Sequence, residues 1–316
     1  YDYFINKKFI PGLVTIIIPN YNEGAKLLRA VISVQNQTYK QIEIIVADDG
    51  STDNSISLVK EKSIKNLKVL KLDHSGHPNY PRNEAIKISN GEYIGFLDAD
   101  DVFTTTKIEK QINYFKKNPD YNVLYCDSKI GDSNLTIKTE SWFKDRDRMV
   151  EGDIFNTTLN IFHPKIKGFQ LSPEWLLIKR SILFKTGLMS TKIKFLSDWE
   201  FGLRLASVSK IGCVKESLTI QDRGNYASHY SSKFQNQFLE NPYSKIEQVL
   251  KLLKSFENLT DVQKKMIKSS IPNFLRISAI RQSTFNKNKG AFLYLFCVLK
   301  KEPFNYKNYI LLIKIL

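Results

Sequence analysis

Short β-branched runs alternate with helical segments through the first hundred residues, and this alternation limits the fold more than any other feature. The runs lie at residues 14–19, 42–47, 67–72 and 91–97. Between the first two runs, apolar residues recur at helical spacing over 27–35. Such alternation is typical of a doubly wound, mostly parallel α/β sheet with right-handed crossovers. We therefore expect a Rossmann-like sheet that binds its ligand at the carboxyl ends of the strands.

The fourth apolar run leads directly into three carboxylates, Asp98, Asp100 and Asp101. Residues i and i+2 of an extended backbone point the same way, so Asp98 and Asp100 can face one site. That site would lie at the end of a strand, where open α/β sheets bind their ligands.

Length and charge indicate a second part of the chain. The 316 residues exceed the usual size of one domain. We expect an α/β domain over 1–235, followed by a basic helical region over 236–316. The net charge is +15, and the segment from Asn241 onward, with 14 Lys or Arg against 4 Asp or Glu, contributes +10 of it.

The basic C-terminal helices allow two interpretations. Basic amphipathic helices can lie on an anionic membrane surface. Alternatively, they pack on the catalytic domain and expose a solvated lysine face. No basic-aromatic motif of a nucleic-acid reader is present, so we predict no nucleic-acid partner.

Cysteine usage and hydropathy predict the compartment. The three cysteines are far apart and have no CxxC spacing, which predicts a reduced, cytoplasmic protein, peripheral on the inner face of the plasma membrane if the basic helices bind it. There is no signal segment and no run of 18 apolar residues. Because the first residue is Tyr, the chain can be a piece of a longer protein.

Residues 131–167 carry little periodicity, and we expect a long, substrate-facing loop region there. Regular structure is expected again at 176–182 and in a helix that starts at Ser197, a candidate N-cap. Two further apolar helices are expected at 291–301 and 306–316.

Four motifs, in this order, resemble the inverting glycosyltransferase family 2, which has a GT-A fold and whose bacterial members build surface polysaccharides. They are Pro19-Asn-Tyr-Asn-Glu23, Asp48-Asp-Gly-Ser-Thr-Asp53, Arg82-Asn83 ahead of Gly91-Glu-Tyr-Ile94, and Asp98-Ala-Asp100. The resemblance covers about residues 13–230, with a nucleotide-sugar half over about 13–130 and an acceptor half over about 131–235.

The resemblance implies a site for a nucleotide-sugar and a divalent cation, Mn²⁺ or Mg²⁺, which neutralises the leaving diphosphate. Asp100 would bind the metal and His229 would complete its shell. The residues implied for the nucleotide-sugar are Pro19, Tyr21, Glu23, Asp49, Arg82, Asn83, Asp98, Ala99 and Arg223. Asp49 would accept a hydrogen bond from uracil, and Tyr21 would stack on the ring or be an ordinary loop aromatic. Arg82 would reach the phosphates, or pair with an acidic residue and only shape the site.

By resemblance, the general base is the Asp of a Glu-Asp pair at a helix start. Here the pair reads Ser197-Asp198, followed by Trp199-Glu200, so Asp198 is the implied base and Glu200 the fallback. Asp198 could instead be a carboxylate that stabilises the helix N-terminus.

The implied function is metal-dependent, inverting transfer of a hexosyl or N-acetylhexosaminyl group, most simply from a UDP-sugar. The acceptor would be a hydroxyl of a glycan, a teichoic polymer or a lipid-linked sugar. One alternative is a nucleotidyltransferase, although no Gly-rich phosphate loop precedes the first helix. Another is a nucleotide- or glycan-binding module without catalysis.

Overall fold

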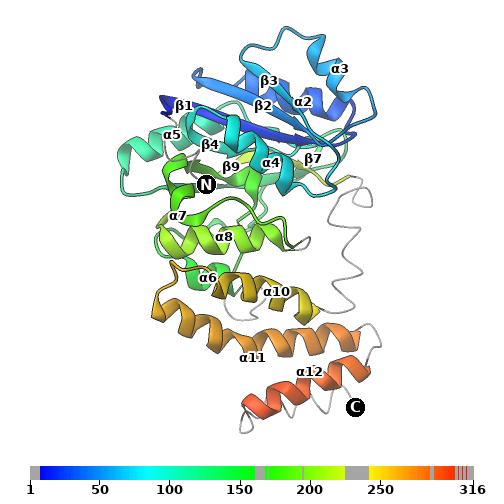
Figure 1. The fold of residues 1–316 in the computed structure, drawn as a ribbon, viewed down its shortest axis with the longest axis vertical. Helices are drawn as coiled ribbons and strands as arrows, with labels where there is room; N and C mark the ends of the chain where they lie inside the picture. Colours follow the sequence, from blue (N-terminus) through cyan, green and yellow to red (C-terminus); the bar gives the residue numbers. More distant parts are fainter. Residues whose placement is uncertain are drawn as a thin grey trace. The chain divides into compact units, whose positions relative to one another are not determined.

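The computed structural model describes residues 8–160, 168–169, 171–193, 196–224, 242–284 and 288–302, with Asn305, Asn308 and Leu311. Contacts divide the chain into two compact units (Figure 1). Unit 1 comprises Tyr1–Ile154, Leu171–Lys192 and Val208–Asn225. Unit 2 comprises Phe155–Gln170, Ile193–Ser207 and Tyr226–Leu316.

A single sheet organises unit 1, and among the described residues it has nine strands. The strands are β1 (Ile10–Asn20), β2 (Ile42–Asp48), β3 (Leu67–Lys71), β4 (Gly91–Phe96), β5 (Val102–Phe103), β6 (Val123–Gly131), β7 (Ile137–Thr139), β8 (Leu177–Lys179) and β9 (Ile211–Asp222). Their order is β3-β2-β1-β4-β8-β6-β9-β5, and β7 pairs with β6. β3, β2, β1 and β4 are mutually parallel, and β8 is antiparallel to both β4 and β6. The predicted α/β fold with a mostly parallel sheet is confirmed.

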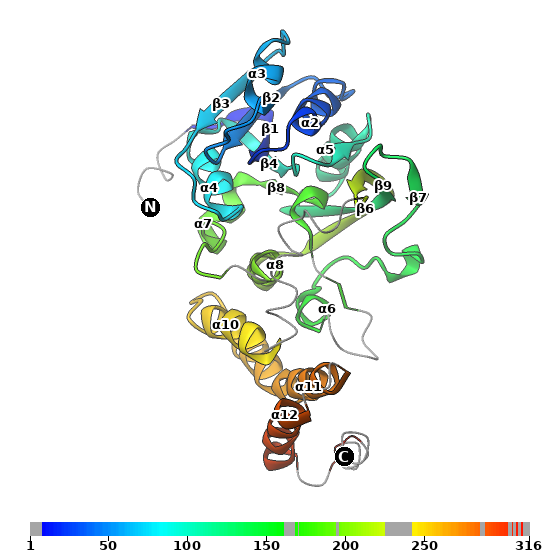
Figure 2. The same ribbon diagram turned by 90° about the vertical axis from the view of Figure 1, so that its right-hand side faces the viewer.

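Helices cover both faces of this sheet. Figure 2 shows α2 (Ala25–Gln35) and α5 (Lys107–Lys117) on one side and α4 (Asn79–Ile88) on the other. Alternate residues of β1 explain the two layers, because side chains along a strand point to opposite faces. Val14, Ile16 and Ile18 join the core cluster beneath α2 and α5.

The remaining elements of unit 1 are short. They are α3 (Ser55–Lys60), α7 (Leu183–Thr186), and the 3₁₀ turns η1 (Arg146–Arg148), η2 (Pro173–Trp175) and η3 (Arg180–Ile182). The predicted loop region over 131–167 thus contains β7 and η1, and the short helix α6 (Phe155–Leu159). Residues 161–167 lie outside the described part of the chain.

Unit 2 is helical. Besides α6 it contains α8 (Ser197–Val208, whose last residue belongs to unit 1), α10 (Pro242–Lys254), α11 (Asp261–Thr284) and α12 (Asn288–Lys301). Trp199 is its anchor: the indole donates to the Thr158 carbonyl at 2.6 Å and packs edge-on against Phe274. In the described residues, no helix combines the length and apolar character needed to cross a bilayer.

Some boundaries differ from the sequence-based expectation. The long strand β9 was not predicted, because its middle residues, Lys215 and Glu216, are exposed and interrupt the apolar pattern. Ser197 is the first residue of α8 rather than its cap, and Leu196 before it has a positive φ of 62°. The helix expected at 306–316 lies mostly outside the described residues.

Glu43 ties four segments together at the end of the sheet where the parallel strands begin. Its carboxylate accepts from Thr15 Oγ1 at 2.6 Å, from the Asn90 backbone N–H at 2.5 Å and from Lys68 Nζ at 3.1 Å. Burial alone would raise the pKa of Glu43, but these donors outweigh burial and lower it.

Replacing Glu43 with Ala should lower the free energy of unfolding by about 2–4 kcal/mol, because it leaves buried donors of Thr15 and Asn90 without an acceptor. Urea unfolding measures this difference. Glu61→Ala, on the exposed end of α3, is the control and should change stability by no more than about 0.5 kcal/mol.

The same carboxylate sets a pH dependence. Since the folded pKa of Glu43 lies below its unfolded value of about 4.3, its stabilisation is present above that pH and is lost as the pH falls through the folded value. Glu43→Gln should lack this part of the acid dependence. An unfolding curve of equal pH dependence in both proteins would contradict the assignment.

Candidate active site

Asp98 and Arg82 form the centre of the candidate site. Arg82 is buried on α4, and its guanidinium pairs with Asp98, just beyond β4, at 2.5 Å and donates to Asn79 Oδ1 at 3.0 Å. The Asp98 side chain is 38% exposed, so its carboxylate reaches solvent. The structure thus pairs Arg82 with an acidic residue.

Further carboxylates crowd this edge of the sheet. Burial, and then the charge of Asp98, raise the pKa of Asp100 to about 6. Burial and then Asp100 raise the pKa of Glu23 to about 7. Asp101 is buried, and burial followed by repulsion from Asp100 puts its pKa well above the usual range. These carboxylates therefore repel one another, and a cation among them would relieve that repulsion.

Glu174 belongs to the same cluster, although no pattern in the sequence singles it out. This residue lies in η2, just ahead of β8, far from any motif. Burial and then the charge of Asp98 raise its pKa to about 7, and Ser172 Oγ and Gln221 Nε2 both donate to it. Because β8 is antiparallel to β4, the chain that enters β8 lies beside the chain that leaves β4.

Two basic side chains of α2 form ion pairs with one carboxylate of this region. Lys26 Nζ lies 3.1 Å and an Arg29 terminal nitrogen 3.4 Å from the buried carboxylate of Asp222, at the end of β9. Burial opposes ionisation of Asp222, but the Gly224 N–H and Lys26 outweigh it and lower its pKa. Arg29 also donates to the Asp100 carbonyl at 2.8 Å, so it holds two walls of the site in register.

Asp222 itself is linked to the aspartate cluster through its backbone. Its N–H donates to the Asp101 carboxylate at 2.9 Å. The neighbouring Arg223 is partly buried, and its positive charge lowers the pKa of both Asp100 and Glu174. Arg223 therefore lies within electrostatic reach of the carboxylates.

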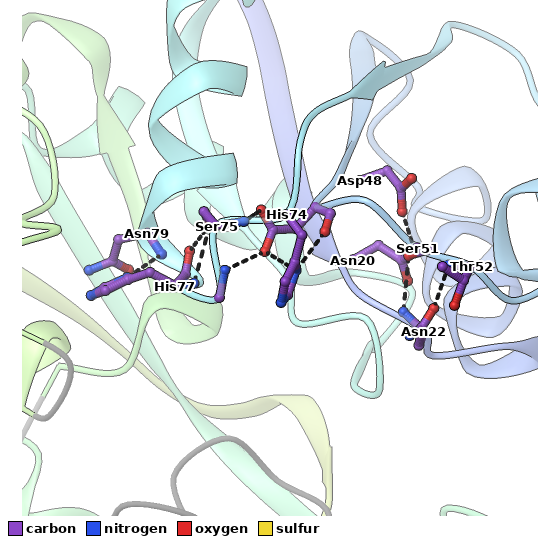
Figure 3. A network of polar contacts seen from close by, with 11 residues as sticks. Asn20, Asn22, Asp48, Ser51, Thr52, His74, Ser75, His77 and Asn79 are labelled. Carbon is purple, nitrogen blue, oxygen red and sulfur yellow. Dashed lines mark hydrogen bonds and ion pairs between the residues drawn. The ribbon is translucent and has the colours of Figure 1, made fainter.

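Asp49 and Tyr21 lie beyond the ends of β2 and β1, and both contact His74. The Asp49 carboxylate accepts the backbone N–H groups of Ser75 at 2.9 Å and Gly76 at 3.1 Å. His74 Nδ1 lies 3.1 Å from the same carboxylate, and the imidazole stacks on Tyr21 with 4.1 Å between ring centroids. Figure 3 shows the hydrogen bonds around His74 and Ser75.

Hydrogen bonds join the polar turns that follow β1 and β2 (Figure 3). Asn20 Nδ2 donates to Asp48 at 2.9 Å and to Ser51 at 3.0 Å, and Asn22 Oδ1 accepts from the Thr52 N–H at 2.8 Å. The Tyr21 side chain is 44% exposed between these anchored neighbours. An exposed aromatic ring beside a carboxylate suits a flat base with an N–H donor.

Three other predicted residues are held by the fold. Pro19 pairs with Ala47 in the sheet, beside the pocket. Ala99 is buried between the two aspartates. Both polar atoms of the Asn83 amide bond to the Met189 backbone, at 2.8 and 3.0 Å, so Asn83 fixes the segment after α7.

Asp198 and Glu200 differ sharply within unit 2. Glu200 is buried, and its two oxygens accept from Arg204 Nε at 2.6 Å and from an Arg204 terminal nitrogen at 2.8 Å. Asp198 is partly exposed in the first turn of α8. His229, predicted to complete a metal shell, lies outside the described residues.

The donor set fits a hard divalent cation. In the described residues, no three His, Cys, Asp or Glu side chains are grouped to hold a metal by themselves. Mg²⁺ and similar ions commonly take one or two protein carboxylates and fill the remaining positions with substrate phosphates and water. Asp100, with Asp98 beside it, can supply those carboxylates.

Comparison with known proteins identifies the family. The model of "Glycosyl transferase family 2" matches residues 15–185, more than half of the chain. The chain belongs to glycosyl transferase family 2. The matched range includes β1 to β4 and the aspartates after β4, so the predicted family is confirmed.

Curated relatives of this family 2 chain include bacterial glycosyltransferases. One is the Escherichia coli UDP-Glc:alpha-D-GlcNAc-diphosphoundecaprenol beta-1,3-glucosyltransferase WfaP, 28% identical over 228 residues, which are 72% of this chain and 82% of WfaP. Another is the Staphylococcus aureus poly(ribitol-phosphate) beta-N-acetylglucosaminyltransferase TarP, 34% identical over 181 residues, 55% of this chain and 52% of TarP. The chain spans about half the length of several curated relatives, TarP among them.

Solved structures share the fold. Residues 1–349 of Staphylococcus aureus TarS in complex with UDP-GlcNAc match with a TM-score of 0.57 at 16% identity, over 91% of this chain and 90% of that one. The mannosyltransferase PcManGT from Pyrobaculum calidifontis, in complex with GDP-Man and Mn²⁺, matches with a TM-score of 0.61 at 14% identity, over 99% and 84% of the two chains. At these identities the likeness concerns the fold alone.

Proposed function

We propose that this family 2 chain transfers a sugar from a UDP-sugar to a hydroxyl group of a cell-surface glycan or a lipid-linked acceptor, with inversion. The observation that carries the proposal is the cluster of Asp98, Asp100 and Glu23, in which burial and then repulsion between carboxylates raise the pKa of Asp100 and Glu23, together with an exposed Tyr21 ring that could stack on a base. A divalent cation and a diphosphate together would complement that cluster.

The proposed donor site uses residues on both sides of β1. Tyr21 stacks on uracil and Asp49 accepts from its imide N–H, while the Ser75 and Gly76 amides keep the Asp49 carboxylate in place. Asp100 binds Mn²⁺ or Mg²⁺, which supplies charge neutralisation of the leaving diphosphate. Arg82 orients Asp98 toward the ribose or the metal, and Arg223 contacts phosphate.

We assign the general base to Asp198 and not to Glu200. Both oxygens of Glu200 are occupied by Arg204 in a buried pair, so Glu200 holds the helix and is a poor acceptor for a substrate proton. Asp198 removes the proton from the acceptor hydroxyl as this oxygen attacks the anomeric carbon in line with the leaving diphosphate.

The relatives favour a surface-polymer acceptor. WfaP is named for a diphosphoundecaprenol acceptor, and TarP for a poly(ribitol-phosphate) acceptor. We extend this class, and not the particular sugar, to this chain. WfaP is also named for UDP-Glc, which supports UDP as the nucleotide.

The first experiment is a donor screen. UDP-, GDP- and dTDP-sugars with Mn²⁺ should give nucleoside diphosphate release from a UDP-sugar alone, and EDTA should abolish it. Asp100→Asn should remove the Mn²⁺-dependent part of UDP affinity measured by calorimetry, whereas Asp120→Asn, outside the cluster, should keep it. Equal UDP affinity with and without Mn²⁺ in the unaltered protein would refute the metal role of Asp100.

The base is tested separately. Asp198→Asn should lower kcat by roughly 10²–10⁴-fold, the usual worth of a general base, and leave UDP affinity unchanged. Turnover equal to that of the unaltered protein would remove Asp198 from the mechanism. Release of nucleotide by none of the donors would favour a binding module.

We also propose that unit 2 contacts an anionic membrane surface. Val262 at the start of α11 and Phe296 on α12 are 62% and 54% exposed. The exposed lysines of the two helices are Lys264, Lys265, Lys268, Lys300 and Lys301. Apolar side chains set among lysines are typical of interfacial helices, and a membrane position would bring the enzyme to a lipid-linked acceptor.

Vesicle sedimentation tests this contact. The chain should bind vesicles with about 30% anionic lipid and release them as salt rises toward about 0.5 M. Reversing the charge of Lys264, Lys265 and Lys268 to Glu should abolish binding. The same change at Lys60, Lys62 and Lys65, exposed in unit 1, alters net charge equally and should have little effect. Equal loss in both triple variants would show that overall charge, and not unit 2, is responsible.

A further inference from the structure

Trp142 is a half-exposed aromatic residue in the segment between β7 and η1, and no step of the proposed mechanism uses it. Its side chain is 46% exposed, whereas its neighbour Phe143 is buried. A single exposed aromatic residue is ordinary on a protein surface. Trp142 differs because of how firmly its segment is held.

A buried carboxylate holds this segment. Asp127, fully buried on β6, accepts from Ser141 Oγ at 2.5 Å, from the Trp142 N–H at 3.1 Å and from Ser217 Oγ at 3.0 Å. The Trp142 N–H also donates to the Ser128 carbonyl at 2.7 Å. Burying a carboxylate is costly unless it is well hydrogen-bonded, and here its bonds converge on the backbone that carries Trp142.

Aromatic packing fixes the ring as well as the backbone. The Trp142 ring lies 5.9 Å from the buried ring of Trp175. Phe143 packs on Trp175 at 5.6 Å and on Tyr125 at 6.2 Å. The Trp142 indole thus packs at a tilt of 59° against a buried aromatic cluster, and nearly half of the residue's surface stays open to solvent. Such a surface is ordered before any ligand arrives, which lowers the entropic cost of binding.

Strand register relates the Trp142 segment, which Asp127 holds, to the proposed reaction centre at Asp98. Gly95 on β4 pairs with Leu177 on β8, and Leu177 also faces Leu124 on β6. Asp127 lies three residues beyond Leu124 on β6, and Asp98 lies three residues beyond Gly95, just past the end of the parallel strand β4. β4 and β6 are separated by one strand, β8, so they lie about 10 Å apart, a distance that one or two sugar rings can span.

Glu174 and Trp175 make the connection between the two places. Glu174 lies within electrostatic reach of Asp98, and the next residue, Trp175, packs against Trp142. Two consecutive buried residues therefore link Trp142 to the carboxylate cluster, and every residue of this path belongs to unit 1.

We propose that the exposed face of Trp142 is an acceptor subsite that stacks against the C–H face of a hexopyranose ring. A large, rigid indole surface provides apolar contact area at little conformational cost, and the hydroxyl groups at the rim of the sugar ring remain hydrated. This subsite deepens the proposed glycosyltransferase function and rests on it, since it seats the sugar that receives the transferred group.

Intrinsic fluorescence tests the subsite without any turnover. The sequence has three Trp residues, and Trp175 and Trp199 are buried, so acrylamide should quench chiefly Trp142. Cellotetraose and chitotetraose are the probes. Either one should reduce the acrylamide quenching constant by half or more, and Trp142→Phe should show little quenching and no response to sugar. Undiminished quenching with both sugars would overturn the inference.

Kinetics provide the second readout. Trp142→Ala should raise the KM for a tetrasaccharide acceptor about tenfold, the equivalent of about 1.4 kcal/mol, and leave the KM for the donor and acceptor-free donor hydrolysis unchanged. Phe184→Ala is the matched control, because Phe184 is 43% exposed and stacks on Phe9, beside the start of β1 and far from the carboxylates.

The outcomes separate the two claims. If Trp142→Ala transfers sugar with an unaltered acceptor KM, the subsite is refuted and the proposed glycosyltransferase activity is retained. Sugar protection of Trp142 without nucleotide release from any donor would keep the subsite and point to a glycan-binding module.

Discussion

Electrostatic crowding of carboxylates at one edge of the sheet is the constraint on which the rest of the structure depends. Glu23, Asp98, Asp100, Asp101, Glu174 and Asp222 come from four separate segments, and like charges so close together are unfavourable in a folded chain. The fold tolerates them because Arg82 pairs with Asp98, and Lys26 and Arg29 with Asp222. These pairs offset only part of the repulsion between the carboxylates. A cation bound together with a diphosphate would relieve the rest.

Residues of one motif have different tasks. Asp98 faces solvent and Arg82, whereas Asp101 is buried and accepts from the backbone of Asp222, which makes it a brace between β4 and β9. The same division separates Asp198 from Glu200: a bidentate pair with Arg204 occupies Glu200. Spacing alone cannot tell such neighbours apart, since burial and partner choice decide which carboxylate remains available to a substrate.

The sequence predicted the parallel half of the fold well and the mixed half poorly. β1, β2 and β4 are rich in β-branched and aromatic residues because most of their side chains are buried, and each is followed by a motif that resembles the family's. β9 escaped prediction, since exposed Lys215 and Glu216 interrupt its pattern. Glu174, Lys26 and Arg29 were missed for a different reason: they reach the site through strand order and helix packing, which no short motif records.

Because β8 runs in the reverse direction, two different stretches of chain supply residues to the same edge of the sheet. Strands that run with β1 bring donor-side residues to the edge at their ends, but β8 brings Glu174 and Trp175 there at its beginning. The chain ahead of β8 can therefore lengthen, shorten or change sequence while residues 19–100 stay as they are. Chimeras that exchange only the segment between β6 and β8 would thus vary the proposed acceptor side of the reaction and leave the proposed nucleotide-binding residues unchanged.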